Sequence, residues 1–281
     1  MTEHFFTITQ IEEYRLYLQE QEKSANTILK YTRDLRRFHD FCELNQSVSK
    51  ELVLQYKDYL GKNYAMSSAN SMLAALNSFF QFIGWHDCVT KSFKSQKASF
   101  RQKELELSME EYRALIHAAM GKNDERMGLL IQTIASTGIR IGELPFITVE
   151  AVNIGHAQVT LKGKSRTVML PASLRQKLRS YIVAKRIESG SVFITKSGKP
   201  MDRSNVCRSM KRLGRLAGIS EDKLFPHNLR HLFAVRYYEV EHDLARLADI
   251  LGHSNINTTR IYTMVSSETH MQTINQMGMV V

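Results

Sequence analysis

The chain has 281 residues, of which 43% are hydrophobic, enough for one large or two modest domains. Its 38 Lys and Arg against 28 Asp and Glu give a net charge of +10, which favours a polyanionic partner. Three scattered cysteines exclude a disulfide framework or a four-cysteine zinc site, and we expect no signal peptide, no membrane span and a cytoplasmic protein.

The first 85 residues show amphipathic patterns that predict a four-helix bundle. The predicted helices cover 8–20, 24–42, 49–62 and 67–84. The pattern over 24–42 begins at Ser24, a plausible N-cap. We expect a helical N-terminal domain over residues 1–90. Its second predicted helix carries one apolar face, formed by Ile28, Tyr31, Leu35, Phe38 and Cys42.

Residues 87–103 lose this periodicity and are rich in Lys, Ser and Gln, which is typical of an exposed basic linker. We place the linker itself at 91–103. A capping-box pattern, Ser108 with Glu111, then marks a new helix. The second domain is therefore expected over 104–281.

The second domain is predicted to be mostly helical with a small sheet. Met127, Leu130, Ile131 and Ile134 indicate a buried helix that ends near Gly138. Segments 157–161 and 166–170 flank K-G-K-S and predict a β-hairpin with Lys162 and Lys164 at its tip. Later helices are expected around Leu174, Val206, Leu229 and Leu244. The predicted fold class is thus mainly α with a small β-sheet.

Positive charge is concentrated in three stretches, 87–103, 162–186 and 196–215. They hold 20 of the 38 basic residues and two of the 28 acidic ones. Phosphate-backbone binding requires such concentration, although separate solvated faces would also explain it. The expected DNA-binding residues are Lys91, Lys94, Lys97, Lys164, Arg166, Arg203 and Arg208.

Two simpler motifs also occur in the second domain. Gly163-Lys164-Ser165 ends like a nucleotide-binding loop, but Gln158 stands where that loop needs its first glycine, so we reject it. His227 and His231 have the i, i+4 spacing of metal ligands, yet the glutamate of a zinc protease is missing between them. A metal hydrolase stays open as an alternative.

Three segments of the second domain stand out together: S-T-G-I-R-I-G-E-L (136–144), H-N-L-R-H (227–231) and L-G-H-S-N-I-N-T-T-R-I-Y-T (251–263). Singly, each has an ordinary explanation as an ion pair, a helix cap or packing. In this order, and with S-x-N-T-x-x-x-Y-x-x-D-L-x-x-F at 24–38, the sequence resembles the tyrosine recombinase (phage integrase) family in its two-domain, Xer-like form. The resemblance covers nearly the whole chain.

The resemblance implies a set of site residues. Arg140 and Arg230 would hold the scissile phosphate, and Tyr262 would be the nucleophile. Glu143 would orient a neighbouring catalytic side chain. Pro145 is unexpected so close behind Arg140 and predicts a shorter helix there. Lys162 is preferred to Lys164 as the hairpin lysine, although both stay open. The implied catalytic residues are Arg140, Lys162, His227, Arg230, His253 and Tyr262.

The chemistry explains these residue types. A phenol with a pKa of about 10 is a weak nucleophile and needs a base, which His227 or His253 could supply. Two guanidiniums bind phosphate oxygens and offset the charge of the transition state. A lysine at the hairpin tip can protonate the leaving 5′ oxygen. A phosphotyrosine intermediate retains the bond energy, so neither a metal nor ATP is needed, and we expect no cofactor.

The resemblance therefore implies a site-specific DNA recombinase that cleaves and rejoins strands through a 3′-phosphotyrosine. It implies a homotetramer on two recombination sites, with the tail 264–281 docked on a neighbouring protomer. Packing of the tail on its own domain, or disorder, is the alternative. Within DNA chemistry, a type IB topoisomerase-like activity is the alternative. A catalytically silent DNA-binding regulator is a second one.

Overall fold

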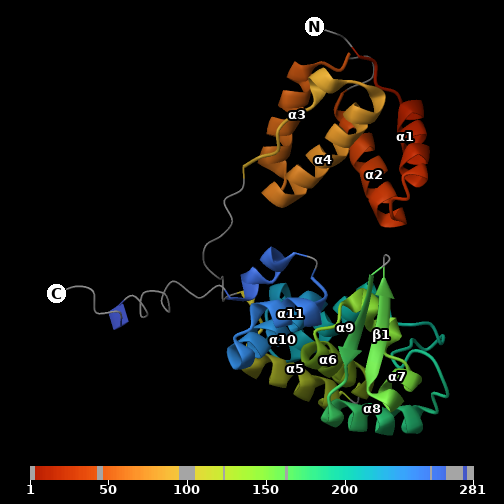
Figure 1. The fold of residues 1–281 in the computed structure, drawn as a ribbon, viewed down its shortest axis with the longest axis vertical. Coiled ribbons are helices and arrows are strands. Elements are labelled where there is room, and N and C mark those ends of the chain that lie inside the picture. Colours follow the sequence, from red (N-terminus) through yellow and green to blue (C-terminus); the bar gives the residue numbers. More distant parts are fainter. Residues whose placement is uncertain are drawn as a thin grey trace. The chain divides into compact units, whose positions relative to one another are not determined.

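The computed structural model describes residues 4–42, 47–94, 105–122, 124–161, 164–253, 255–263 and 275–276. The chain divides into two compact units, Met1–Lys97 and Ala98–Val281 (Figure 1). Each unit has its own hydrophobic core, and each is described below by itself.

Helices α1 to α4 build the N-terminal unit, in agreement with the predicted bundle. Side-chain oxygens of Thr7, Ser24 and Ser49 accept hydrogen bonds from backbone N–H groups at the starts of α1, α2 and α3. These bonds satisfy donors that a helix start leaves unpaired. The observed bounds are α1 Ile8–Glu20, α2 Ala25–Phe41, α3 Lys50–Asn63 and α4 Met66–Ile83.

Aromatic rings dominate the core of this unit. Phe38, Phe79 and Phe80 are fully buried, and Trp85 packs with its ring centroid 6.0 Å from that of Phe79. The ring of His4 stacks on Trp85 at 4.6 Å. Burial of one such ring stabilises the fold by about 1.5–3 kcal/mol relative to its exposure. The aromatic cluster therefore holds the four helices together.

The start of the segment 87–103, expected to be exposed, is held on α4 through its backbone at Thr90 and Phe93. Asn77 on α4 donates to the carbonyl of Thr90 at 2.7 Å and accepts from its N–H at 2.9 Å. Asn70, two turns earlier, holds both backbone groups of Phe93 in the same way. The prediction of exposure was wrong for Cys88 and Thr90, which are buried, because amide side chains of α4 replace water as hydrogen-bond partners of the backbone here. Lys91 and Ser92 are exposed, as expected.

The C-terminal unit is helical with one antiparallel hairpin, as predicted. Among the described residues, no helix has the length and apolar character needed to cross a membrane. The bounds are α5 Met109–Gly121, α6 Glu125–Thr137, η3 Ile141–Phe146, α7 Val149–Ile154, β1 His156–Leu161, β2 Lys164–Met169, α8 Ala172–Lys185, α9 Arg203–Leu216, η4 Glu221–Lys223, α10 Pro226–Glu241, α11 Leu244–Leu251, η5 Ile256–Thr258 and η6 Arg260–Thr263.

Helix α6 lies at the centre of this unit and packs against α5, α8, α9 and α10. The predicted core residues Met127, Leu130, Ile131 and Ile134 are all fully buried. The predicted capping box of Ser108 and Glu111 starts α5, with both reciprocal hydrogen bonds present. Periodicity and capping signals therefore located these helices correctly.

The hairpin differs from the prediction at its turn. Strands β1 and β2 pair from His156 opposite Met169 to Leu161 opposite Lys164. Lys164 belongs to β2, whereas we had expected it at the tip of the hairpin. Lys162 lies outside the described residues. Strand β1 packs against α7 (Figure 1) and also against η3.

Gly138 ends α6 in the left-handed region at φ 63°, where its main chain turns towards Arg140. A Cβ at this position would lie 2.5 Å from the Phe233 ring and 2.9 Å from Leu251. Only glycine meets both the backbone and the steric requirement.

We therefore predict that Gly138→Ala destabilises the C-terminal unit more than Gly218→Ala does. Gly218 has φ 68°, but a Cβ added there would meet nothing within 4 Å. Gly218→Ala therefore measures only the cost of the left-handed backbone, about 1–2 kcal/mol in the free energy of unfolding. Crowding at Phe233 adds about 1–3 kcal/mol for Gly138→Ala. Urea unfolding of the full chain, followed by far-UV circular dichroism, compares the two. Equal losses would show that Phe233 and Leu251 move aside freely.

Candidate active site

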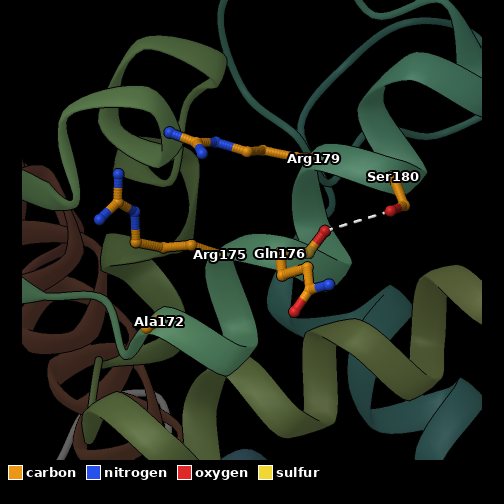
Figure 2. Close-up of a pocket in the computed structure, with 5 residues that line it drawn as sticks. All are labelled: Ala172, Arg175, Gln176, Arg179 and Ser180. Carbon is orange, nitrogen blue, oxygen red and sulfur yellow. Dashed lines mark hydrogen bonds between the residues drawn. The ribbon is translucent and has the colours of Figure 1, made fainter.

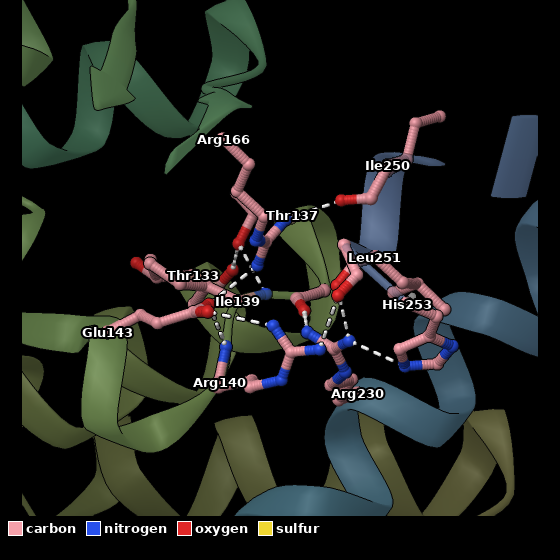
Figure 3. Close-up of polar contacts among 12 residues, drawn as sticks. Thr133, Thr137, Ile139, Arg140, Glu143, Arg166, Arg230, Ile250, Leu251 and His253 are labelled. Atoms are coloured by element: carbon pink, nitrogen blue, oxygen red, sulfur yellow. Dashed lines mark hydrogen bonds and ion pairs between the residues drawn. The ribbon is translucent and has the colours of Figure 1, made fainter. Parts of the chain in front are cut away.

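Arg230 is a fully buried arginine in the first turns of α10, a helix that starts with Pro226. Its guanidinium donates to the carbonyls of Gly138 at 2.5 Å and Leu251 at 2.7 Å (Figure 3). Burial, with the neighbouring Arg140 and Arg166, lowers the pKa of Arg230 to about 10. The group therefore stays charged at neutral pH, and it joins the end of α6 to the end of α11.

Arg140 and Glu143 form the second part of the site, where the chain leaves Gly138. Glu143 accepts from the Arg140 side chain at 2.8 Å through Oε1 and from the Arg140 backbone N–H at 2.9 Å through Oε2. The other terminal nitrogen of Arg140 donates to the carbonyl of Gly252 at 3.0 Å. Because the Arg140 side chain is 40% exposed, it can still meet an incoming ligand.

Arg166 is placed differently from the expectation that it faces DNA. Its side chain is 12% exposed and donates to Glu143 Oε2 at 2.6 Å, and its other terminal nitrogen binds the carbonyl of Ile250 (Figure 3). Burial opposes ionisation of Glu143, but hydrogen bonds from Arg166 and Arg140 outweigh it and lower the pKa of that carboxyl. Glu143 is therefore a carboxylate shared by two arginines.

His253 has a defined tautomer. Its Nε2 lies 2.9 Å from a terminal nitrogen of Arg230, which can only donate, so Nε2 accepts. Its Nδ1 then carries the proton and donates to the hydroxyl of the buried Thr259 at 2.8 Å. Burial and the nearby arginines lower the pKa of His253 to about 4. The imidazole is neutral at physiological pH.

The two histidines of α10 lie in different surroundings. His227 is exposed at the helix start, and partial burial with Arg230 and Arg140 lowers its pKa. His231 is 3.5 Å from Glu106 and packs its ring against that of Tyr262, with centroids 5.0 Å apart. Among the described residues, neither histidine belongs to a group of three potential metal ligands. The described residues thus offer no third metal ligand beside His227 and His231.

Tyr262 lies in η6 and is 3% exposed. It belongs to a buried apolar cluster with Ala234, Val235, Leu247 and Leu251, and the ring of His253 lies nearly parallel to its ring, with centroids 6.3 Å apart. Burial raises the pKa of Tyr262, while the interacting Arg230 and the charge of Arg140 act in the opposite direction. The phenol thus stands beside a fixed cation.

The structure brings Arg140, Glu143, Arg230, His253 and Tyr262 into one cluster, and His227 borders it. The other predicted residues lie elsewhere. Lys91 and Lys94 are exposed at the end of the N-terminal unit, and Arg203 and Arg208 are exposed on α9. Lys164 is placed through its backbone in β2 only. Of the predicted residues and segments, Lys97, Lys162 and the tail 264–281 apart from 275–276 lie outside the described residues.

Not all of the clustered positive charge is available for a ligand. Figure 2 shows Arg175 and Arg179 on α8, which line a shallow surface pocket. Both donate to the carbonyl of Asn153, and Arg175 also donates to that of Val152. They satisfy carbonyls at the end of α7. Part of the charge in 162–186 is therefore structural.

Sequence reasoning missed two parts of the site. Thr259, which accepts from His253 Nδ1, lies three residues before Tyr262, and this spacing of one turn was the available signal. The carbonyls of residues 250 to 252 hold Arg166, Arg230 and Arg140 in turn. A main-chain acceptor leaves no trace in the residue types, so only the structure could reveal it.

The cluster carries three guanidiniums against one carboxylate, with neutral imidazoles beside them. Its net charge is positive, and Arg140 keeps donors open to solvent. Such fixed cations stabilise an anion without the reorganisation that water would need. The site is therefore suited to a phosphate-like ligand next to the Tyr262 phenol.

Comparison with known proteins agrees with this geometry. The phage integrase family matches residues 106–269, and the phage integrase N-terminal SAM-like domain matches residues 11–86. The chain is 30% identical to tyrosine recombinase XerA of Pyrococcus furiosus, covering 92% of this chain and 90% of that protein. It is 31% identical to tyrosine recombinase XerD of Staphylococcus saprophyticus, covering 92% and 94%.

The fold is also that of solved structures. A lambda integrase dimer bound to a COC′ core site has a TM-score of 0.74 at 17% identity, covering 92% of this chain and 95% of that one. At this identity the likeness concerns the fold. The family matches and the two relatives span both units, and the chain therefore belongs to the phage integrase family of tyrosine recombinases, the enzymes that break and rejoin DNA strands.

Proposed function

We propose that the enzyme recombines two specific DNA sites through Tyr262. The phenolic oxygen attacks a backbone phosphorus, the new O–P bond forms as the bond to the 5′ oxygen breaks, and a 3′-phosphotyrosine results. A 5′-hydroxyl from another strand then reverses the step and seals a new junction. The observation that carries the proposal is the buried Tyr262 phenol beside Arg230, with the solvent-accessible Arg140 in the same cluster.

The proton movements follow from the same residues. His227 or His253 would receive the phenol proton, because the lowered pKa values of both leave them unprotonated at neutral pH. His253 would first have to give up the hydrogen bond that its Nε2 accepts from Arg230. Arg140 and Arg230 would offset the charge that builds on the phosphorus oxygens. We propose Lys162 rather than Lys164 as the acid for the leaving 5′ oxygen, since Lys164 belongs to β2 and is paired with Leu161.

We further propose that residues 1–90 form a core-binding domain, 91–103 a linker and 104–281 the catalytic domain. Lys91, Lys94, Lys97, Lys164, Arg203 and Arg208 would contact DNA phosphates, which position a duplex without reading its sequence. A lambda integrase tetramer bound to a Holliday junction shares this fold. By analogy, four protomers would act on two sites in the cytoplasm, with the tail 264–281 docked on a neighbour.

Tyr262→Phe should abolish covalent trapping on a nicked suicide duplex that carries the natural site, because no oxygen remains to bond phosphorus. Wild-type protein should be trapped, as seen by a shifted band on a denaturing gel. Tyr237→Phe, a partly buried tyrosine of α10, is the matched control and should be trapped like wild type. Trapping of Tyr262→Phe would refute the assignment. A recombinase exchanges strands between two marked DNA sites, whereas a topoisomerase-like enzyme only relaxes supercoiled DNA, so an exchange assay separates the two activities.

Arg140→Ala and Arg230→Ala should both bind the duplex but cleave it roughly 100- to 1,000-fold more slowly, as expected for the loss of a charge-stabilising donor. They should differ in stability. Arg230→Ala leaves the carbonyls of Gly138 and Leu251 without their partner and should cost about 1–3 kcal/mol more.

Single-turnover cleavage and thermal unfolding measure the two effects. Arg236→Ala, an exposed arginine of α10 paired with Glu239, is the control and should change neither. Normal cleavage by Arg140→Ala would argue against its role at the phosphate.

Stability should fall as the pH drops from about 6.5 towards 4. The ordinary pKa of His253 is 6.5 and the folded value is about 4, so in this range the unfolded chain binds more protons than the folded one. His253→Gln, whose amide can accept from Arg230 and donate to Thr259, should flatten this slope. Hydrogen exchange of α10 peptides between pH 7 and 5 measures it. An unchanged slope would contradict the burial of a neutral imidazole.

A further inference from the structure

We propose that Arg166 is a positioning residue that neutralises Glu143 and so keeps the charge of Arg140 available to the scissile phosphate. This inference rests on the proposed function, because it concerns how the phosphate-binding arginine is prepared. It replaces the expectation that Arg166 itself contacts DNA.

The first support is that the two carboxylate oxygens of Glu143 have different hydrogen-bond donors. Oε1 accepts from the Arg140 side chain at 2.8 Å, whereas Oε2 accepts from the Arg140 backbone at 2.9 Å and from Arg166 at 2.6 Å. With Oε2 occupied, the carboxylate cannot bind the Arg140 guanidinium with both oxygens. A bidentate pair of that kind would draw Arg140 away from a ligand.

The second support is charge. Glu143 is 3% exposed, so water screens its negative charge poorly. Without Arg166, Glu143 and Arg140 together would be neutral, and a phosphate beside them would meet no net cation from this pair. With Arg166, the three groups carry one net positive charge. The pairing distances of 2.6 and 2.8 Å put both arginines in direct contact with the carboxylate.

The third support is that Arg166 is built in and held away from solvent. It binds the carbonyl of Ile250, and a Cβ at Gly252 would lie 2.5 Å from its side chain. The carbonyl of Gly252 in turn accepts from Arg140 at 3.0 Å. One short peptide segment thus aligns both arginines, and a side chain 12% exposed at this place has little surface left for DNA.

A double-mutant cycle in single-turnover cleavage of the suicide duplex tests this inference. Arg166→Ala should cleave roughly 10- to 100-fold more slowly than wild type, less than the loss expected for a residue that contacts the phosphate. DNA affinity should stay within about twofold, since a positioning residue makes no phosphate contact. Adding Glu143→Gln should restore most of the rate, because it removes the charge that Arg166 would have balanced.

Two controls separate this role from a structural one. Arg166→Lys retains the charge and should keep most of the wild-type rate. Arg175→Ala removes another arginine that binds main-chain carbonyls, and Glu143→Gln should give no gain in that background. A merely structural Arg166 would likewise show no gain when Glu143 is replaced.

The outcomes are distinct. A normal rate in Arg166→Ala, a double variant no faster than Arg166→Ala, or a loss of DNA affinity that matches the loss of rate would each overturn the inference while the proposed function stands. Wild-type protein that is never trapped on the duplex would overturn the proposed function and this inference with it.

Discussion

The buried guanidinium of Arg230 is the contact on which the rest of the site depends. A cation with 2% exposure is tolerated only where acceptors replace its lost water, and two main-chain carbonyls and an imidazole nitrogen do so here. Those acceptors come from the ends of α6 and α11, more than a hundred residues apart in sequence. The site can form only when the whole C-terminal unit has folded, and its precision follows from the rigidity of the helices that carry it.

A cluster of positive charges also needs a negative charge to reduce its repulsion, and Glu143 supplies it. The carboxylate holds Arg140 and Arg166 together, yet leaves the site with a surplus of positive charge. Burial is the main reason that the pKa of His253 is low, and the surplus lowers it further, since a second cation beside Arg230 would be repelled. A phosphate entering this site would meet cations already in place, with no cost for bringing them together.

Much of the fold and most of the cluster could be predicted from residue types. Ser24 and the Ser108–Glu111 box marked helix starts correctly, and Arg140, Arg230, His253 and Tyr262 do meet. The misses share one cause, because they depend on tertiary partners. Asn77 binds the backbone of a segment that was expected to be an exposed linker. Glu143 binds the side chain of Arg166, which was expected to contact DNA. Periodicity reports which face of an element is apolar, but not which polar group will find a buried partner.

The aromatic core of the N-terminal unit has a practical consequence. Trp85 is the sole tryptophan of the chain and lies wholly within that unit. Intrinsic indole fluorescence therefore reports on the helical bundle and is blind to the catalytic half. Emission and circular dichroism recorded on one sample would show, without any label, whether the two halves melt together or in succession.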